Sequence, residues 1–126
     1  MSHNIESITS AKIGLALDAA VLRQQAIASN IANVNTEGYV PMRLSFASQL
    51  EQLQADFSNN SFSAGQMFAP KLELEPVLDR DGNPAKVELD AEVVAMAHNS
   101  VQYQALLKGL SRHYSIMSTA VSEGKR

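Results

Sequence analysis

The amino-acid sequence predicts a mainly α-helical protein in which two long helices, one at each end of the chain, pair as an antiparallel coiled coil. Both terminal segments repeat apolar residues at alternating spacings of four and three, which is the pattern of helices that wind around each other. The segment between them is richer in Pro, Gly, Ser and Asn, so we expect it to be mostly loop, with a short helix and a β-hairpin. The chain of 126 residues is short enough to form a single domain, residues 1–126.

The first helix is expected over residues 5–32, and it is apolar on two sides. One stripe is expected to face the C-terminal helix of the same chain: Ile13, Leu17, Ala20, Ile27 and Ile31, with Gln24 among them. The second stripe lies on roughly the opposite side of the helix: Ile8, Leu15, Ala19, Leu22 and Ala26. Because a helix that is apolar on two faces needs neighbours on both, we expect the second stripe to contact another subunit.

The last helix is expected over residues 90–122, with Asp90 as its N-cap. Its apolar seam keeps alternating spacing for about eight turns and contains one polar residue, Ser100. The seam residues expected to pair with the first helix are Val93, Met96, Tyr103, Leu107, Leu110, Tyr114 and Met117. The two helices are similar enough in length to pair along most of their extent.

The middle segment, residues 40–88, differs in character from both ends. Pro41 discourages continuation of the first helix. A short amphipathic pattern predicts a brief helix within Leu44–Phe57, and the residues 58–69 that follow are Ser-, Asn- and Gly-rich and predict a loop.

A β-hairpin is predicted over residues 71–89. Leu and Glu alternate within Lys71–Leu78, as in a strand, and Asp81-Gly82-Asn83-Pro84 is a strong turn signal. Val87–Leu89 would return as the second strand, and Pro76 favours an edge position.

Composition argues against several classes of function. The net charge is −3 and no basic patch with exposed aromatics is evident, which disfavours nucleic-acid binding. There is no cysteine, His98 and His113 would be about 22 Å apart on one helix, and Asp79-Arg80-Asp81-Gly82-Asn83 lacks the spacing of a calcium loop. We therefore expect no metal, no cofactor, no small-molecule substrate and no catalytic residue. No apolar run long enough to span a membrane and no Sec-type signal peptide is found.

The charges of the second half of the chain are unevenly distributed. Seven acidic residues lie between Glu73 and Glu92, whereas the chain beyond residue 97 is basic apart from Glu123. Two interpretations remain open: complementary charge between stacked subunits, or solubility alone.

Ser29–Tyr39 reads Ser-Asn-Ile-Ala-Asn-Val-Asn-Thr-Glu-Gly-Tyr, with more asparagines than a helix stop requires. Asn and Gly tolerate left-handed backbone angles, so the cluster predicts the end of the first helix and a turn. We expect Asn35, Thr36 and Gly38 to be structural, whereas Asn30 and Asn33 could have specific partners within the fold or on a neighbour.

Leu15–Tyr39 resembles the N-terminal signature of the bacterial flagellar basal-body rod and hook family, whose first helix ends in a run like SNIANVNTPGY. The matching residues are Asn30, Asn33, Asn35, Thr36, Gly38 and Tyr39. Val87–Arg126 is also similar to the C-terminus of proximal-rod members. Glu37 stands where the family usually has Pro, and Pro41 follows Val40, so the resemblance leaves the path of residues 33–41 open.

The resemblance implies a structural, self-assembling subunit of the proximal rod, part of the motility drive shaft, and no enzyme. Its partners would be other rod subunits, FliE, the MS-ring end of the basal body and the flagellar type III export apparatus. It would lie in the periplasm-spanning rod after export without a cleaved signal peptide. The alternatives are another rod subunit such as FlgC, or a soluble helical binding module such as an export chaperone or a regulatory coiled coil.

Overall fold

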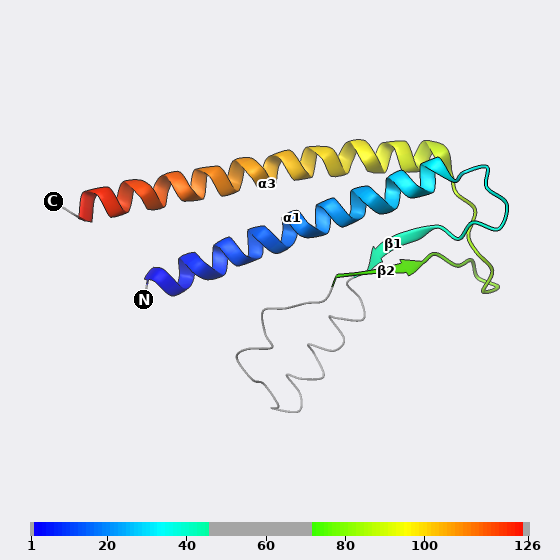
Figure 1. Cartoon of the computed structure of the whole chain (residues 1–126), viewed down its shortest axis with the longest axis horizontal. Helices are drawn as coiled ribbons and strands as arrows, with labels where there is room; N and C mark the ends of the chain where they lie inside the picture. Colours follow the sequence, from blue (N-terminus) through cyan, green and yellow to red (C-terminus); the bar gives the residue numbers. More distant parts are fainter. Residues whose placement is uncertain (1, 46–71, 125–126) are drawn as a thin grey trace, which may run out of the picture.

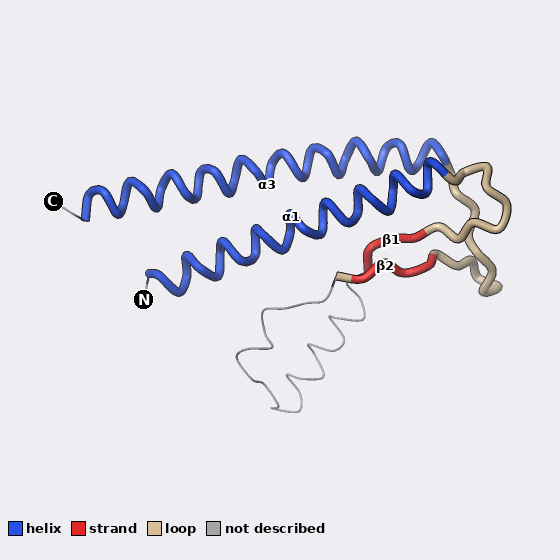
Figure 2. Tube along the Cα trace, in the orientation of Figure 1, coloured by secondary structure: helices blue, strands red, loops and turns tan. Residues whose placement is uncertain are grey.

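Two long helices run side by side along most of the molecule, and a small sheet lies beside one of them (Figures 1 and 2). The computed structural model describes residues 2–45 and 72–124, with side chains from residue 9 onward. The elements are α1 (Ser2–Ala32), β1 (Met42–Ser45), β2 (Glu73–Pro76) and α3 (Leu89–Gly124). The predicted fold class, mainly helical with one long helix at each end of the chain, is confirmed.

The two helices are antiparallel, and both termini lie at the same end of the molecule (Figure 1). Arg23 of α1 donates a hydrogen bond to Asn99 of α3, with 3.1 Å between Nη1 and Oδ1. Nδ2 of Asn30 lies 3.5 Å from Oε1 of Glu92. A step of seven residues forward along α1 therefore corresponds to seven residues backward along α3, so both contacts belong to one register.

Few apolar side chains are buried, and most of them are small. Among the described residues, Ala19, Ala20, Ala26 and Ile27 are buried on α1, and Pro41 is buried just before β1. Small side chains let two helix backbones approach closely but remove little apolar area from water. The pairing of α1 with α3 in a single chain therefore buries only a modest core.

α3 begins one residue before the predicted range 90–122, and its N-cap lies two residues before the predicted one. The helix begins at Leu89, and the backbone N–H of Glu92 donates to the carbonyl of Glu88 at 3.0 Å. Glu88 therefore holds the N-cap position that was predicted for Asp90. Asp90 and Glu92 lie in the first turn, where the positive end of the helix dipole favours acidic side chains.

The sheet has a different second strand from the one predicted. β2 forms within the predicted stretch, but it pairs antiparallel with β1, in the register Met42↔Pro76 to Ser45↔Glu73. Val87–Leu89 cannot supply the partner strand because α3 already begins at Leu89. The prediction of a hairpin over residues 71–89 was therefore wrong in its pairing.

The turn predicted after β2 is present. Oδ1 of Asp79 accepts hydrogen bonds of 2.9 Å from the backbone N–H groups of Asp81 and Asn83, and Gly82 has a φ of 82°. The two arms of the turn stay paired as far from its tip as Val77 and Ala85, where the backbone N–H of Ala85 donates to the carbonyl of Val77 at 2.9 Å.

α1 lies between α3 and the sheet (Figure 1). β1 packs against α1, and Leu44 and Ser45 belong to β1, which excludes them from the brief helix predicted over Leu44–Phe57. The rest of that predicted helix and the predicted loop 58–69 lie outside the described residues.

Candidate assembly interface

Asn30 connects the end of α1 to the first residue of β1. Its side chain is only 3% exposed. Nδ2 donates to the carbonyl of Met42 at 2.9 Å, and Oδ1 accepts from the backbone N–H of Met42 at 3.0 Å. Oδ1 also accepts a 2.8 Å bond from the hydroxyl of Tyr39. The amide thus satisfies both backbone groups of Met42, as a neighbouring strand would, and holds the start of β1 against the helix.

The loop after α1 folds back by local hydrogen bonds. Nδ2 of Asn33 donates to the carbonyl of Ser29 at 2.8 Å, and the Thr36 hydroxyl donates to Oδ1 of Asn33 at 3.1 Å. Gly38 has a φ of 78°, a left-handed value that glycine adopts without the strain of a side chain. The Tyr39 hydroxyl returns to the helix, 3.1 Å from Oγ of Ser29.

The motif residues therefore differ in their surroundings. Asn30 and Asn33 both have partners within the chain, and Asn35 is exposed in the turn. Val77 donates its N–H to the carbonyl of Pro41 at 2.8 Å, so the chain that leaves α1 is held directly onto the strand that returns to α3. With Glu37 and Pro41 in place, residues 33–41 form a compact return from helix to sheet.

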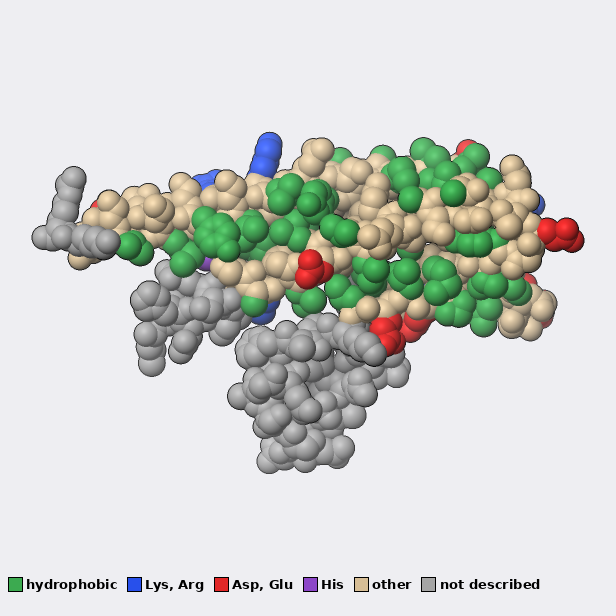
Figure 3. All heavy atoms as spheres, viewed as in Figure 1, with side chains coloured by type: hydrophobic (Ala, Val, Ile, Leu, Met, Phe, Trp, Pro, Cys, Tyr) green, Lys and Arg blue, Asp and Glu red, His purple; other side chains and the backbone are tan. Residues whose placement is uncertain are grey.

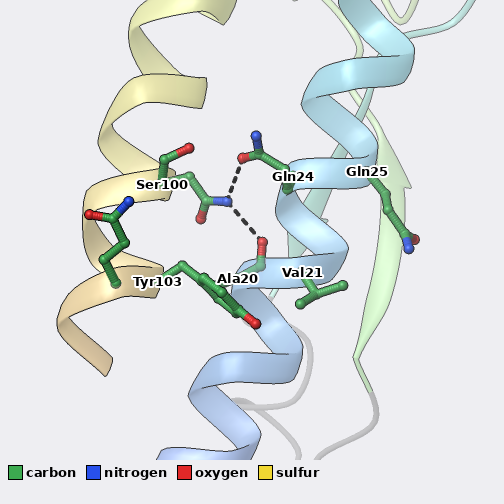
Figure 4. Close-up of a pocket in the computed structure, with 8 residues that line it drawn as sticks. Ala20, Val21, Gln24, Gln25, Ser100 and Tyr103 are labelled. Atoms are coloured by element: carbon green, nitrogen blue, oxygen red, sulfur yellow. Dashed lines mark hydrogen bonds between the residues drawn. The ribbon is translucent and has the colours of Figure 1, made fainter. Parts of the chain in front are cut away.

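A second buried amide, Asn99, lies in the contact between the helices. It is 2% exposed. Nδ2 donates to the carbonyl of Ala20 and to Oε1 of Gln24, each at 2.8 Å, as the dashed lines in Figure 4 show. Oδ1 accepts the bond from Arg23. Asn99 was not among the predicted site residues, because it is a polar residue beside the apolar pattern of the seam. The signal for it was the adjacent pair Arg23 and Gln24 at the facing level of α1.

Only part of the predicted seam lies on the face of α3 that contacts α1. Met96, Tyr103, Leu110 and Met117 of the predicted seam are half-buried there. Between them, seven residues apart, lie the buried Asn99 and the half-buried Leu106 and His113. Nε2 of His113 is buried without a hydrogen-bond partner among the described residues. The pattern of apolar residues favoured a different row, because this one contains two polar side chains.

The other half of the predicted seam is on the surface of the single chain. We call it the shoulder row; its members recur every seven residues: Val93, Ser100, Leu107, Tyr114 and Val121. Leu107 is 42% exposed and Tyr114 is 55% exposed, and Val93 and Val121 are also exposed. Ser100 is half-buried and donates to the carbonyl of Met96 in its own helix. α1 therefore covers one edge of the apolar seam of α3 and leaves the other edge in water.

The residues predicted to face another subunit from α1 fall into two groups. Ala19 and Ala26 are buried within the single chain, on the side of α1 that carries Asn30 and receives β1, so neither offers a free surface to a neighbour in this structure. Leu15 and Leu22 are half-buried, and the side chain of Ile8 lies outside the described part of the chain. In the first stripe Ala20 and Ile27 are buried, while Ile13, Leu17 and Ile31 are half-buried.

A groove runs between α1 and α3 beside the shoulder row. It has a volume of about 370 Å³ and a mostly apolar lining that includes Val21, Gln25, Ser100, Tyr103 and Gln104. Figure 4 shows these side chains coming from both helices. The space-filling view shows hydrophobic side chains over both helices rather than a single deep hollow (Figure 3). A shallow apolar groove between helices suits a protein contact better than a small polar ligand.

Within residues 2–45 and 72–124, no cluster of three or more His, Asp or Glu side chains could hold a metal ion. The described helices include none that is long and apolar enough to span a bilayer. An elongated pair of helices with apolar rows still open to solvent has the features of a structural subunit that associates with other chains.

Comparison with known proteins agrees with this class. Residues 15–39 match the family described as flagella basal body rod protein. The chain is 32% identical over 127 residues to the flagellar basal body rod protein FlgB of Escherichia coli, covering 86% of this chain and 89% of that protein. It is 28% identical over 118 residues to FlgB of Bacillus subtilis, covering 87% and 90%. FlgB of Borreliella burgdorferi is 29% identical over 113 residues, covering 78% and 83%.

The chain belongs to the flagellar basal body rod proteins, and within them to the FlgB group. It is accordingly a structural subunit of the flagellar basal-body rod, in a family whose members are structural proteins. The part of the chain that matches the family profile ends at Tyr39, whose hydroxyl closes the hydrogen-bonded return at the end of α1.

Proposed function

We propose that this chain polymerises through its terminal helices in the proximal part of the rod, as part of the drive shaft of motility. The observation that carries the proposal is the shoulder row of α3, which keeps the spacing of a coiled-coil seam but is uncovered in the single chain. Complete burial of a Leu or Val side chain stabilises by about 1.5–3 kcal/mol, and about half of that remains unused at each exposed shoulder position. Helices of neighbouring subunits would cover this row.

The partners in this proposal are inferred from membership of the family as well as from the exposed apolar rows. The partners are other rod subunits, FliE and the MS-ring end of the basal body. The chain reaches the periplasm-spanning rod through the flagellar type III export apparatus, without a cleaved signal peptide. Val93, Leu107 and Tyr114 were predicted to pair with α1 of the same chain but are exposed there, and helices of neighbouring subunits would cover them in the assembled rod.

The test places charge on the shoulder row. The double variant Leu107→Asp/Tyr114→Asp should remain monomeric in sedimentation velocity, under conditions in which the unmodified chain forms larger species, because an ionised carboxylate opposes burial. The matched control is Gln102→Asp/Ala120→Asp, which adds the same charge at exposed positions of α3 outside the shoulder row. Equal association of the shoulder variant and the unmodified chain would contradict the proposal.

A cellular test separates a rod subunit from a soluble binding module. A strain without this protein should assemble an MS ring but no rod, and the unmodified chain and the control variant should restore swimming. The shoulder variant should restore neither rod nor swimming at equal expression. An export chaperone or regulatory coiled coil would instead leave a rod visible in the deletion strain.

A further inference from the structure

α3 carries a second exposed row, which neither α1 nor the shoulder row includes. We call it the outer row: Val94, Val101, Lys108 and Arg112. Val94 is 69% exposed and Val101 is 67% exposed, and the two cations are exposed as well. Each of the first three directly follows a shoulder-row residue in sequence, so the outer row lies about 100° further round the helix. It is a ridge that is apolar toward the start of α3 and basic toward its end.

The groove between α1 and α3 has the complementary character. Val21, which is exposed on α1, forms part of its apolar lining. Asp18 lies three residues before Val21 on the same face of α1 and is also exposed. The shoulder-row residue Ser100 lines the opposite wall. Leu107 lies seven residues further on, on the same face of α3. The lining of the groove is therefore mostly apolar, and an exposed carboxylate, that of Asp18, lies about 4.5 Å from Val21 along α1.

We propose that the outer row of α3 from a second copy of this chain seats in the groove between α1 and α3. Val94 and Val101 would cover the apolar lining, and Lys108 and Arg112 would lie near Asp18. This inference rests on the proposed function, since it identifies which surface of a neighbouring subunit covers the shoulder row. Both surfaces occur on every copy, and their charges are opposite.

The charges also determine the direction of the incoming helix. With Val101 placed level with Val21, Lys108 lies about 10 Å further along the incoming helix, and Asp18 lies about 4.5 Å from Val21 along α1. If the incoming α3 runs parallel to the host α3, Lys108 and Asp18 are offset by about 6 Å along the axis, within reach of a lysine side chain. In the reverse direction the offset is about 15 Å. The contact therefore favours subunits that all point the same way.

The proposed contact joins two different surfaces, so it is heterologous. Such a contact leaves the groove of one copy and the outer row of the other free, and it can repeat into a ring or a helical filament. An isologous contact, with outer row against outer row, would stop at a dimer and would place Lys108 and Arg112 of both copies close together.

Cysteine cross-linking tests the pairing directly, because the chain contains no cysteine. Chains carrying Val21→Cys are mixed with chains carrying Val101→Cys at a concentration where the unmodified chain associates, and then oxidised. A disulfide-linked dimer should form in the mixture and not with either variant alone. Val21→Cys mixed with Ile116→Cys is the control, because Ile116 is also exposed but lies about 22 Å further along α3.

The results distinguish failure of this inference from failure of the proposed function. Oligomers without a cross-link between positions 21 and 101 overturn the inference alone. A cross-link in the Val101→Cys sample by itself also overturns it, since that indicates an isologous contact. A chain that stays monomeric at every concentration overturns the proposed self-assembly, and this inference with it.

Charge exchange provides an independent measure. Asp18→Lys or Lys108→Glu should each weaken association about fivefold, and the two changes combined should recover most of that loss. Lys12→Glu is the control, because it makes the same change as Lys108→Glu at an exposed position on the opposite side of α1 from Val21. Additive losses in the combined variant would overturn the proposed pairing of charges.

Discussion

Asn30 shows why the asparagine cluster is more than a helix stop. A buried amide has two donors and an acceptor oxygen that must find partners, and Asn30 meets this requirement with Met42, Tyr39 and Glu92. A shorter or apolar residue at position 30 would leave both backbone groups of Met42 without these bonds. The site positions β1, and through β1 it covers the side of α1 that carries Ala26.

At the residue scale, Asn30→Ala should lower the free energy of unfolding by about 2–3 kcal/mol, because it leaves buried polar groups without partners. Urea unfolding followed by circular dichroism measures the loss, and hydrogen exchange of the Met42 amide should become faster. Asn35→Ala is the matched control, since Asn35 is exposed, and its effect should stay within about 0.5 kcal/mol. Similar losses for both variants would contradict the special role of Asn30.

At the scale of the elements, Asn99 acts on the pairing of α1 with α3. A polar residue inside a helix-helix seam costs stability but restricts the register, because only one alignment satisfies its hydrogen bonds. Asn99 reaches Ala20, Gln24 and Arg23 only when α3 lies at its observed height along α1. Most of the apolar residues that α1 and α3 place between them are only half-buried, so they discriminate poorly between registers.

Asn99→Leu should therefore leave the thermal midpoint unchanged or raise it, while the register becomes heterogeneous. Spin labels on cysteines introduced at Ala28 and Ala91, both exposed, report the alignment as a distance distribution. That distribution should be narrow in the parent and broad or multiple in the variant. Ser100→Leu is the control, because Ser100 bonds within its own helix. A narrow distribution in Asn99→Leu would show that apolar contacts alone set the register.

At the scale of the whole molecule, the paired helices are long and thin, and few of the described side chains are buried. Its buried apolar side chains within the described residues are three alanines, one isoleucine and Pro41. The large side chains of the shoulder and outer rows remain in water. Much of the stability of the helices should therefore come from association with other copies.

The thermal midpoint should accordingly rise with protein concentration. Mass action adds about 2.7 kcal/mol when the free partner is about a hundredfold above its dissociation constant. Circular dichroism melts over a range of concentrations measure the shift. Leu107→Asp/Tyr114→Asp should show no such shift, and a midpoint of the parent that is independent of concentration would contradict stabilisation by assembly.

The long-range arrangement was only partly predictable from local pattern. The helices were expected close to their observed bounds because their apolar periodicity extends over many turns. The position of β2 was predicted correctly, but its partner strand was not. Strand pairing depends on contacts between distant residues, and the sequence offers a nearer candidate, Val87–Leu89. The row of α3 that faces α1 was not identified as a whole, because its polar members Asn99 and His113 interrupt the apolar pattern.

The sequence by itself determined the two terminal helices, the turn at Asp81-Gly82-Asn83-Pro84 and the helix-ending role of the asparagine cluster, since each depends on local propensity and periodicity. Only the tertiary structure decided which edge of the α3 seam meets α1, that β1 pairs with β2, and that Asn30 bonds to Met42. These features depend on satisfying buried polar groups across the fold. That requirement becomes visible only when segments far apart in the chain are brought together.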